Sequence, residues 1–166
     1  MTLELPSELR EALSLVGFDW PDADEDKLNA MGQAWSSFAG TLKGLIAEAE
    51  GHAKAVWDGN KGLPIDTFQQ SWTGPEAPLA NLRDAAESAA QIALALSVAA
   101  EIVLLLKGKV ILELTAFARV LYLAAMAAKT PWTAVGAVAA VIIARMIAVQ
   151  AIDAAFQLAI EKLLNG

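Results

Sequence analysis

The sequence has 166 residues, of which 56% are hydrophobic and 7% aromatic, and it carries a formal net charge of −7. The absence of cysteine excludes disulfides, thiolate metal sites and thiol catalysis, and the single histidine, His52, does not make a histidine-based zinc site alone. Binding to a phosphate backbone requires clustered lysine and arginine, and because no such cluster occurs, nucleic acid is not expected as a partner.

The first predicted helix is short and lies near the amino terminus. Ser7 is expected to cap it and Gly17 to end it. The chain starts with an acidic, mixed segment, whereas a secretory signal needs basic residues followed by an apolar run of about 7–15 residues. The sequence therefore predicts that any export uses a route independent of a signal peptide.

A long helix is predicted over about residues 24–57. Either Asp22 or Asp24 is expected to cap it, because acidic residues are favourable at a helix start. Apolar residues then recur at steps of three and four, which predicts one face that packs against an antiparallel helix. The residues of this predicted stripe are Leu28, Met31, Trp35, Phe38, Leu42, Leu45, Ala49, Ala53 and Val56.

A turn over Asp58–Leu63 is predicted to reverse the chain, because glycine and asparagine favour left-handed backbone and Pro64 suits a helix start. Phe68 and Trp72 lie on the face of the returning helix, which is predicted from about residue 65 to 128. The segment 74–78, which contains one glycine and two prolines, is expected to interrupt this helix.

The second half of the chain has a different composition. Residues 1–88 carry six basic and fifteen acidic residues, whereas residues 89–166 carry six basic and four acidic residues and are apolar almost throughout. The Lys107–Lys109 segment forms a polar notch and is a predicted kink. Thr130 is the expected cap, and Pro131 the expected first residue, of a last helix over 131–164.

Six charged residues are embedded in this apolar half: Glu101, Glu113, Arg119, Arg145, Asp153 and Glu161. Unpaired buried charges are costly, so we expect pairs such as Glu101 or Glu113 with Arg145, or exposure along a thin polar stripe. The alternative is a polar lining inside a membrane bundle, with Thr133–Ala151 as the best spanning segment.

The combined pattern resembles the WXG (Trp-x-Gly) helical hairpins of bacterial type VII secretion. Trp57-Asp58-Gly59 stands at the predicted turn after a helix of about thirty residues, and the segment Phe18–Asp26 (FDWPDADED) precedes that helix. Over roughly residues 3–128 the chain is similar to the amino-terminal domains of actinobacterial polymorphic toxins. One departure is that Tyr122 is followed four residues later by Met126, where the usual Tyr-x-x-x-Asp/Glu export signal has an acid.

The resemblance implies a non-catalytic module for export recognition and assembly. Its expected partners are a second copy or a small helical protein, together with the secretion machinery. It implies a protein that is cytoplasmic before export and then secreted, with toxic activity in a downstream domain. No enzyme activity and no cofactor are expected, because the residues offer no catalytic constellation and no ligand set, and the acidic run at Asp22–Asp26 lacks the order of a calcium loop.

The residues expected to mediate interaction are those of the turn and the aromatic residues near it. Trp57 and Gly59 either form a turn displayed to the secretion machinery or close one end of the helical pair. Trp35, Phe38, Phe68 and Trp72 are expected to be interaction anchors, although aromatic residues at helical spacing also suit a core.

The predicted fold is all-α, an elongated helical bundle made of a long WXG-like hairpin and a carboxyl-terminal apolar helix. We expect one helical domain over residues 1–166, with an acidic hairpin part (1–88) and an apolar part (89–166). The excess of apolar residues predicts burial against a partner in a dimer. The alternative function is a membrane-inserting or pore-forming helical domain.

Overall fold

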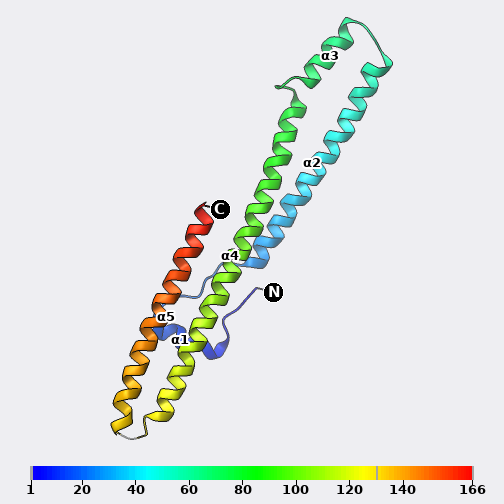
Figure 1. Ribbon diagram of the computed structural model, residues 1–166. Coiled ribbons are helices and arrows are strands. Elements are labelled where there is room, and N and C mark those ends of the chain that lie inside the picture. The colour runs from blue at the N-terminus through cyan, green and yellow to red at the C-terminus, as the bar shows by residue number, and fades with distance from the viewer. Residues whose placement is uncertain (1, 130, 166) are drawn as a thin grey trace. The chain divides into compact units, whose positions relative to one another are not determined.

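The computed structural model describes residues 2–129 and 131–165, and the regular secondary structure in these ranges is entirely helical (Figure 1). This confirms the all-α prediction. The elements are η1 (Ser7–Leu9), α1 (Arg10–Val16), α2 (Glu25–Gly59), α3 (Leu63–Thr73), α4 (Pro78–Ala127) and α5 (Pro131–Asn165).

Most helix ends lie where the sequence places them. Gly17 ends α1 with a φ of 82°, a left-handed conformation that glycine adopts without strain. Pro64 lies in the first turn of α3. The Ser7 cap is wrong, because Ser7 lies inside η1 and makes no side-chain capping bond there. The expected cap at Thr130 lies outside the described residues.

Helix α4 is longer than the composition suggests. It continues through Lys107–Lys109 without a break in its helical assignment, so the polar notch does not end or divide it. The physical reason is that Lys107 is buried in an ion pair and Lys109 pairs with Glu113 one turn later, at an Nζ–Oε1 distance of 2.7 Å. Both charges are therefore accommodated in a regular helix.

Contacts group the chain into two units. One unit comprises Lys27–Ser97 and is called the hairpin unit below; the other comprises Met1–Asp26 with Val98–Gly166 and is called the terminal unit. Each has its own buried cluster. Each is described separately.

In the hairpin unit α2 runs antiparallel to α4, and α3 lies between them in the chain. Ile46 on α2 packs against Leu79 and Ala86 on α4. One turn further along α2, Glu50 makes an ion pair with Arg83. The chain therefore folds back on itself after Gly59, as the sequence predicts.

Most buried positions of the two long helices of this hairpin recur every seven residues. On α2 they are Gly32, Ala39, Ile46 and Ala53, and on α4 they are Leu79, Ala86 and Ala93, with Ala89 buried between the last two. A seven-residue repeat keeps one face of each helix towards its neighbour, as in coiled coils. Most of these residues are small, so the two helix backbones approach each other closely.

This seam differs in part from the predicted stripe. Leu28, Leu42 and Ala49 lie half-buried beside it, but Met31, Phe38 and Leu45 are about half exposed. The prediction followed large apolar residues, whereas the buried row consists mainly of glycine and alanine. The large residues extend the apolar surface sideways around α2 rather than filling the seam.

In the terminal unit α1 packs on the antiparallel helices α4 and α5. Its core lies where the three helices meet, and an aromatic contact adds to it, with the rings of Phe18 and Phe156 stacked at 5.9 Å between centroids. The fully buried core residues are Leu9, Ala12, Val16, Val110, Leu114, Phe117, Ala148 and Ile152. The amino-terminal segment is therefore an integral part of this core.

Candidate interaction surfaces

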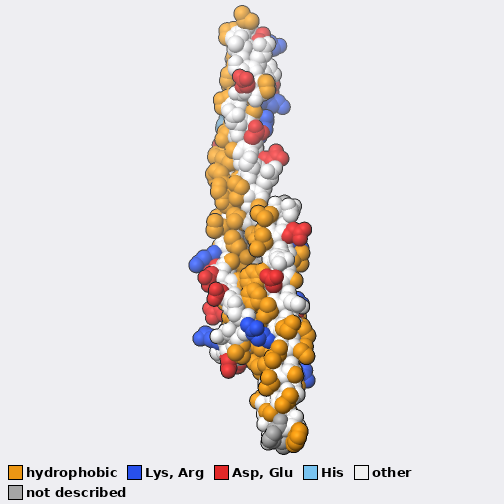
Figure 2. Space-filling model, turned by 90° about the vertical axis from the view of Figure 1, so that its left-hand side faces the viewer, with side chains coloured by type: hydrophobic (Ala, Val, Ile, Leu, Met, Phe, Trp, Pro, Cys, Tyr) orange, Lys and Arg blue, Asp and Glu red, His pale blue; other side chains and the backbone are white. Residues whose placement is uncertain are grey.

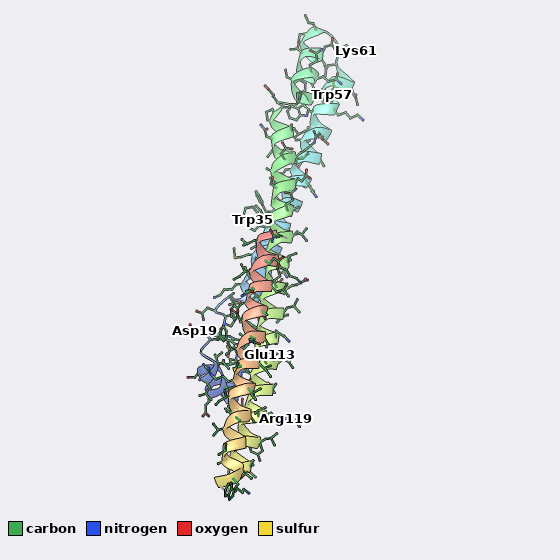
Figure 3. The ribbon with its side chains drawn as sticks, turned by 60° about the vertical axis from the view of Figure 1, so that its left-hand side comes forward. Asp19, Trp35, Trp57, Lys61, Glu113 and Arg119 are labelled. Atoms are coloured by element: carbon green, nitrogen blue, oxygen red, sulfur yellow. The ribbon has the colours of Figure 1, made fainter. Side chains whose placement is uncertain are left out.

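The turn end of the hairpin unit carries an aromatic cluster. Trp57 lies in the last turn of α2 (Figure 3). Its ring centroid is 5.9 Å from that of Phe68 on α3, and the Phe68 centroid is 5.6 Å from that of Trp72. All three side chains are half-buried. The structure thus brings together three of the predicted interaction residues at the turn.

Trp72 carries a buried polar atom without a hydrogen-bond partner. Its ring packs against the buried cluster that contains Ile46 and Leu79, and its indole Nε1–H has no hydrogen-bond acceptor among the described residues. An unpaired buried donor costs about 1–3 kcal/mol, so packing of the ring must offset that cost. Trp72 is therefore held by apolar contacts.

Gly59 does not make the turn. It is the last residue of α2, and a Cβ added there would meet no atom within 4 Å. Gly62 instead takes a φ of 118°, a conformation that side chains rarely adopt, and it precedes α3. The backbone requirement for glycine at this turn thus lies three residues after the Trp-x-Gly motif, so the motif glycine is displayed rather than strained.

The remaining two predicted residues lie elsewhere on α2 and form an exposed pair. The rings of Trp35 and Phe38 meet edge to face at 6.0 Å between centroids, and the two residues are 37% and 49% exposed. Together with Ala34 they line an open hollow of about 310 Å³. With Met31 and Leu45 they form an apolar surface that is called the α2 ridge below.

The terminal unit contains a buried ion pair that the sequence analysis missed. Lys107 is on α4, and Glu25 is the first residue of α2. Lys107 Nζ lies 2.8 Å from Glu25 Oε2, and the side chain of Lys107 is 1% exposed and that of Glu25 5% exposed. Glu25 Oε1 accepts a hydrogen bond from the Leu3 backbone N–H, and Lys107 Nζ lies 5.9 Å from the Trp20 ring centroid. Glu25, which belongs to the acidic run at the start of the predicted long helix, is thus buried.

Burial alone would raise the pKa of Glu25, but the hydrogen bonds from the Leu3 N–H and Lys107 outweigh it and hold the pKa below its usual value of 4.5.

The sequence contains a signal that Lys107 is buried. On α4 the buried residues Ala93, Ala100 and Leu114 are spaced by seven, and Lys107 occupies the missing position of that row. A lysine in a row of buried residues needs a carboxylate partner.

The other embedded charges are not paired as predicted. Arg145 Nε donates to the Leu15 carbonyl of α1 at 2.6 Å, Glu113 pairs with Lys109, and Glu101 is exposed. The prediction of a pair between Glu101 or Glu113 and Arg145 is wrong because the amino-terminal segment, whose position the sequence does not give, supplies the acceptor for Arg145.

His52 lies on the exposed surface of α2, with its Nε2 atom 3.8 Å from Glu48 Oε1, as its helical spacing predicts. Among residues 2–129 and 131–165 no three histidine or acidic side chains come together as a metal-ligating group. The surfaces that stand out are therefore apolar ones.

Comparison with known families agrees with this picture. A family model described as a WXG100 like domain matches residues 4–151. The chain belongs to the WXG100-like domain family. Members of this family are non-enzymatic helical proteins associated with type VII secretion, so the chain is a secretion-related helical protein. No curated protein and no solved structure shows a significant match.

Proposed function

We propose that this WXG100-like chain is a non-catalytic export-recognition and assembly module of a type VII secretion substrate or toxin. It acts by pairing its α2 helix with helices of a second copy or of a small helical partner. The observation that carries the proposal is the α2 ridge, an apolar surface on the side of α2 next to the seam with α4. The two units act as one module in this proposal.

The spacing of the ridge supports a helical partner. Met31, Phe38 and Leu45 are separated by seven residues, the same period as the buried row beginning at Gly32. A helix with two neighbouring seven-residue rows contacts more than one other helix, as in bundles of three or four helices. The hairpin unit supplies a partner for only one of these rows.

The energetic contribution of the ridge is sufficient for association. Its four large side chains are 37–55% exposed. Full burial of such a side chain contributes about 1.5–3 kcal/mol, so covering the remaining half contributes about 1 kcal/mol for each. Trp35 and Phe38 have the additional advantage that aromatic residues dominate binding energies at the centre of interfaces.

The test measures pairing and export with the same variants. Light scattering coupled to size-exclusion chromatography should show that the purified chain pairs, with itself or with a co-expressed small helical protein encoded beside it. The double variant Trp35→Ser, Phe38→Ser should abolish pairing, since both side chains are exposed and helicity should be retained. Leu63→Ser is the matched control, because Leu63 is 78% exposed and lies outside the ridge.

Export is followed by expressing the tagged chain in hosts with and without an intact type VII apparatus. The pairing-competent chain should reach the medium only in the former, and the ridge variant should remain in the cells. A chain that stays monomeric with and without the co-expressed protein, or that appears in the medium of both hosts, would contradict the proposal.

A further inference from the structure

The end of the α4–α5 hairpin is cationic, although the chain as a whole is acidic. Between residues 114 and 152 the charged residues are Arg119, Lys129 and Arg145, all positive, whereas the whole chain has a net charge of −7. The segment 120–144, called the apolar tip below, contains Lys129 as its single charge. Its composition therefore combines apolar side chains with positive charge and no acid.

The apolar tip exposes large side chains and buries small ones. On α5 Ala137 is buried and Ala134 and Ala144 are half-buried, while Trp132 is 92% and Val135 75% exposed. Figure 2 shows hydrophobic side chains gathered on the surface near the end of this hairpin. Further apolar residues of the tip that are at least half exposed are Tyr122, Leu123, Met126, Val138, Ile142 and Ile143.

This arrangement is the reverse of that in a water-soluble bundle. Small residues at the contact and large aliphatic residues outside are typical of helices that pack in lipid, where the outer side chains face acyl chains. The amino-terminal segment leaves most of the tip uncovered. The buried residues of the core formed with α1 extend along the hairpin to Phe117 and Ala148, and the tip residues that pack against this core are Leu121, Val141 and Ala144. The exposed surface of the tip is thus a property of the unit as folded.

We infer that the apolar tip binds an anionic lipid surface, lying in the membrane interface with its large side chains at the headgroup–acyl boundary. Arg119 and Lys129 would contact lipid phosphates, whereas the Arg145 guanidinium donates to the Leu15 carbonyl of α1. An apolar surface with tryptophan and flanking lysine and arginine is the pattern of interfacial membrane helices, which enter by about 5–10 Å. The charge match selects an anionic membrane over a second copy of this acidic chain.

A transmembrane arrangement fits less well than an interfacial one. Two helical segments, 63–127 and 132–165, are long and apolar enough to span a bilayer, each with a best-window mean hydropathy of 2.2. Crossing would carry Lys129 through the hydrocarbon at the turn and place Arg119 and Arg145 within it, and charges at the centre of a bilayer are strongly disfavoured. At the interface Arg119 and Lys129 reach water and phosphate.

The test is flotation of the full chain with two kinds of vesicle. Vesicles of equal parts phosphatidylglycerol and phosphatidylcholine should bind the chain, pure phosphatidylcholine should bind it weakly, and salt should reduce binding to the former. Arg119→Gln and Lys129→Gln should each lower the partition coefficient about fivefold, as expected for one interfacial cation. Lys162→Gln, at the other end of α5, is the matched control and should bind normally.

The apolar contribution is tested by Trp132→Ser, which should lower binding to the mixed vesicles at least tenfold. Its control is Leu164→Ser, since Leu164 is 78% exposed but lies at the carboxyl end of α5. Circular dichroism should show unchanged helicity in all variants. Equal binding to both vesicle types, or equal losses in the tip variants and their controls, would overturn the inference.

A second result would also overturn it. If the chain does not bind vesicles and Trp132→Ser dissolves an oligomer that forms without lipid, the tip is a protein interface. The membrane inference is separable from the proposed pairing through the α2 ridge. The Trp35→Ser, Phe38→Ser variant should keep its binding to anionic vesicles, and Trp132→Ser should keep its pairing.

Discussion

The buried pair of Glu25 and Lys107 allows a prediction in which the cost of removing the lysine depends on pH. Lys107→Met leaves the Glu25 carboxylate buried without its cation, and Glu25→Gln leaves the Lys107 ammonium buried without its anion. Their atoms lie 2.8 Å apart and the side chains are at most 5% exposed, so water does not replace the lost partner. Removing one member of such a pair typically costs about 3–5 kcal/mol.

The structure also limits the cost of Lys107→Met, because the unpaired Glu25 carboxylate escapes by taking up a proton and losing its charge. Protonating Glu25 at pH 7 from its reference pKa of 4.5 costs about 3.4 kcal/mol, at about 1.36 kcal/mol for each pH unit. The destabilisation by Lys107→Met should therefore shrink by about 1.4 kcal/mol per unit as pH falls towards 5.

The wild-type chain is a suitable reference over this range. Burial would raise the pKa of Glu25, but the hydrogen bonds from Leu3 and Lys107 lower it below 4.5. A carboxyl with a lowered folded-state pKa contributes stability that is complete above its unfolded pKa and is lost as pH falls through the folded value. The contribution of Glu25 is therefore constant between pH 5 and 9 and disappears only in stronger acid.

The assay is urea denaturation followed by circular dichroism at pH 5, 7 and 9, with the double variant Glu25→Gln, Lys107→Met completing the cycle. The double variant should lie within about 2 kcal/mol of the wild type at pH 7, because no charge is left buried. Destabilisation in the double variant equal to the sum of the two single values, or a pH-independent value for Lys107→Met, would refute the reasoning.

Two glycine pairs give the remaining predictions. A Cβ at Gly32 would lie 3.1 Å from both the Ala93 carbonyl oxygen and Ser97 Oγ. Gly32→Val should therefore destabilise the chain by about 1–3 kcal/mol in urea denaturation. Gly40→Ala should instead stabilise it by about 1 kcal/mol, because the space around Gly40 is open. Gly62→Ala should cost about 1–3 kcal/mol because of its φ of 118°, and Gly59→Ala should cost nothing in the same assay. Equal effects within either pair would show that the hairpin geometry differs from that described.

The sequence predicts the helices well because composition and turn residues act locally. Gly17 and Pro64 mark helix ends, and the apolar periodicity indicates a hairpin before any coordinates are known. The rotation of α2 was not predictable from the same signal. The residues that fill its seam are Gly32, Ala39 and Ala53, which are small, and hydrophobic periodicity gives more weight to the large side chains beside them.

The candidate site was predictable to a similar degree. Trp57, Phe68 and Trp72 come together because a short turn separates two helices, and this is a local consequence of the sequence. The partner of Lys107 lies 82 residues away in the chain, on a segment whose docking depends on tertiary contacts. Periodicity shows that Lys107 occupies a buried row, but it does not show which carboxylate neutralises it.

The buried rows of small residues on α2 and α4 leave open what fixes the register of one helix along the other. A seam of alanine repeating every seven residues would keep similar contacts if one helix shifted by seven residues along the other. Gly32 removes this ambiguity, because the α4 backbone at Ala93 approaches α2 where a Cβ would lie 3.1 Å from its carbonyl oxygen. After such a shift Ala39 would take the place of Gly32, and its Cβ would make a contact tighter than ordinary van der Waals distance there. The close approach at one glycine thus favours the observed register of the two helices.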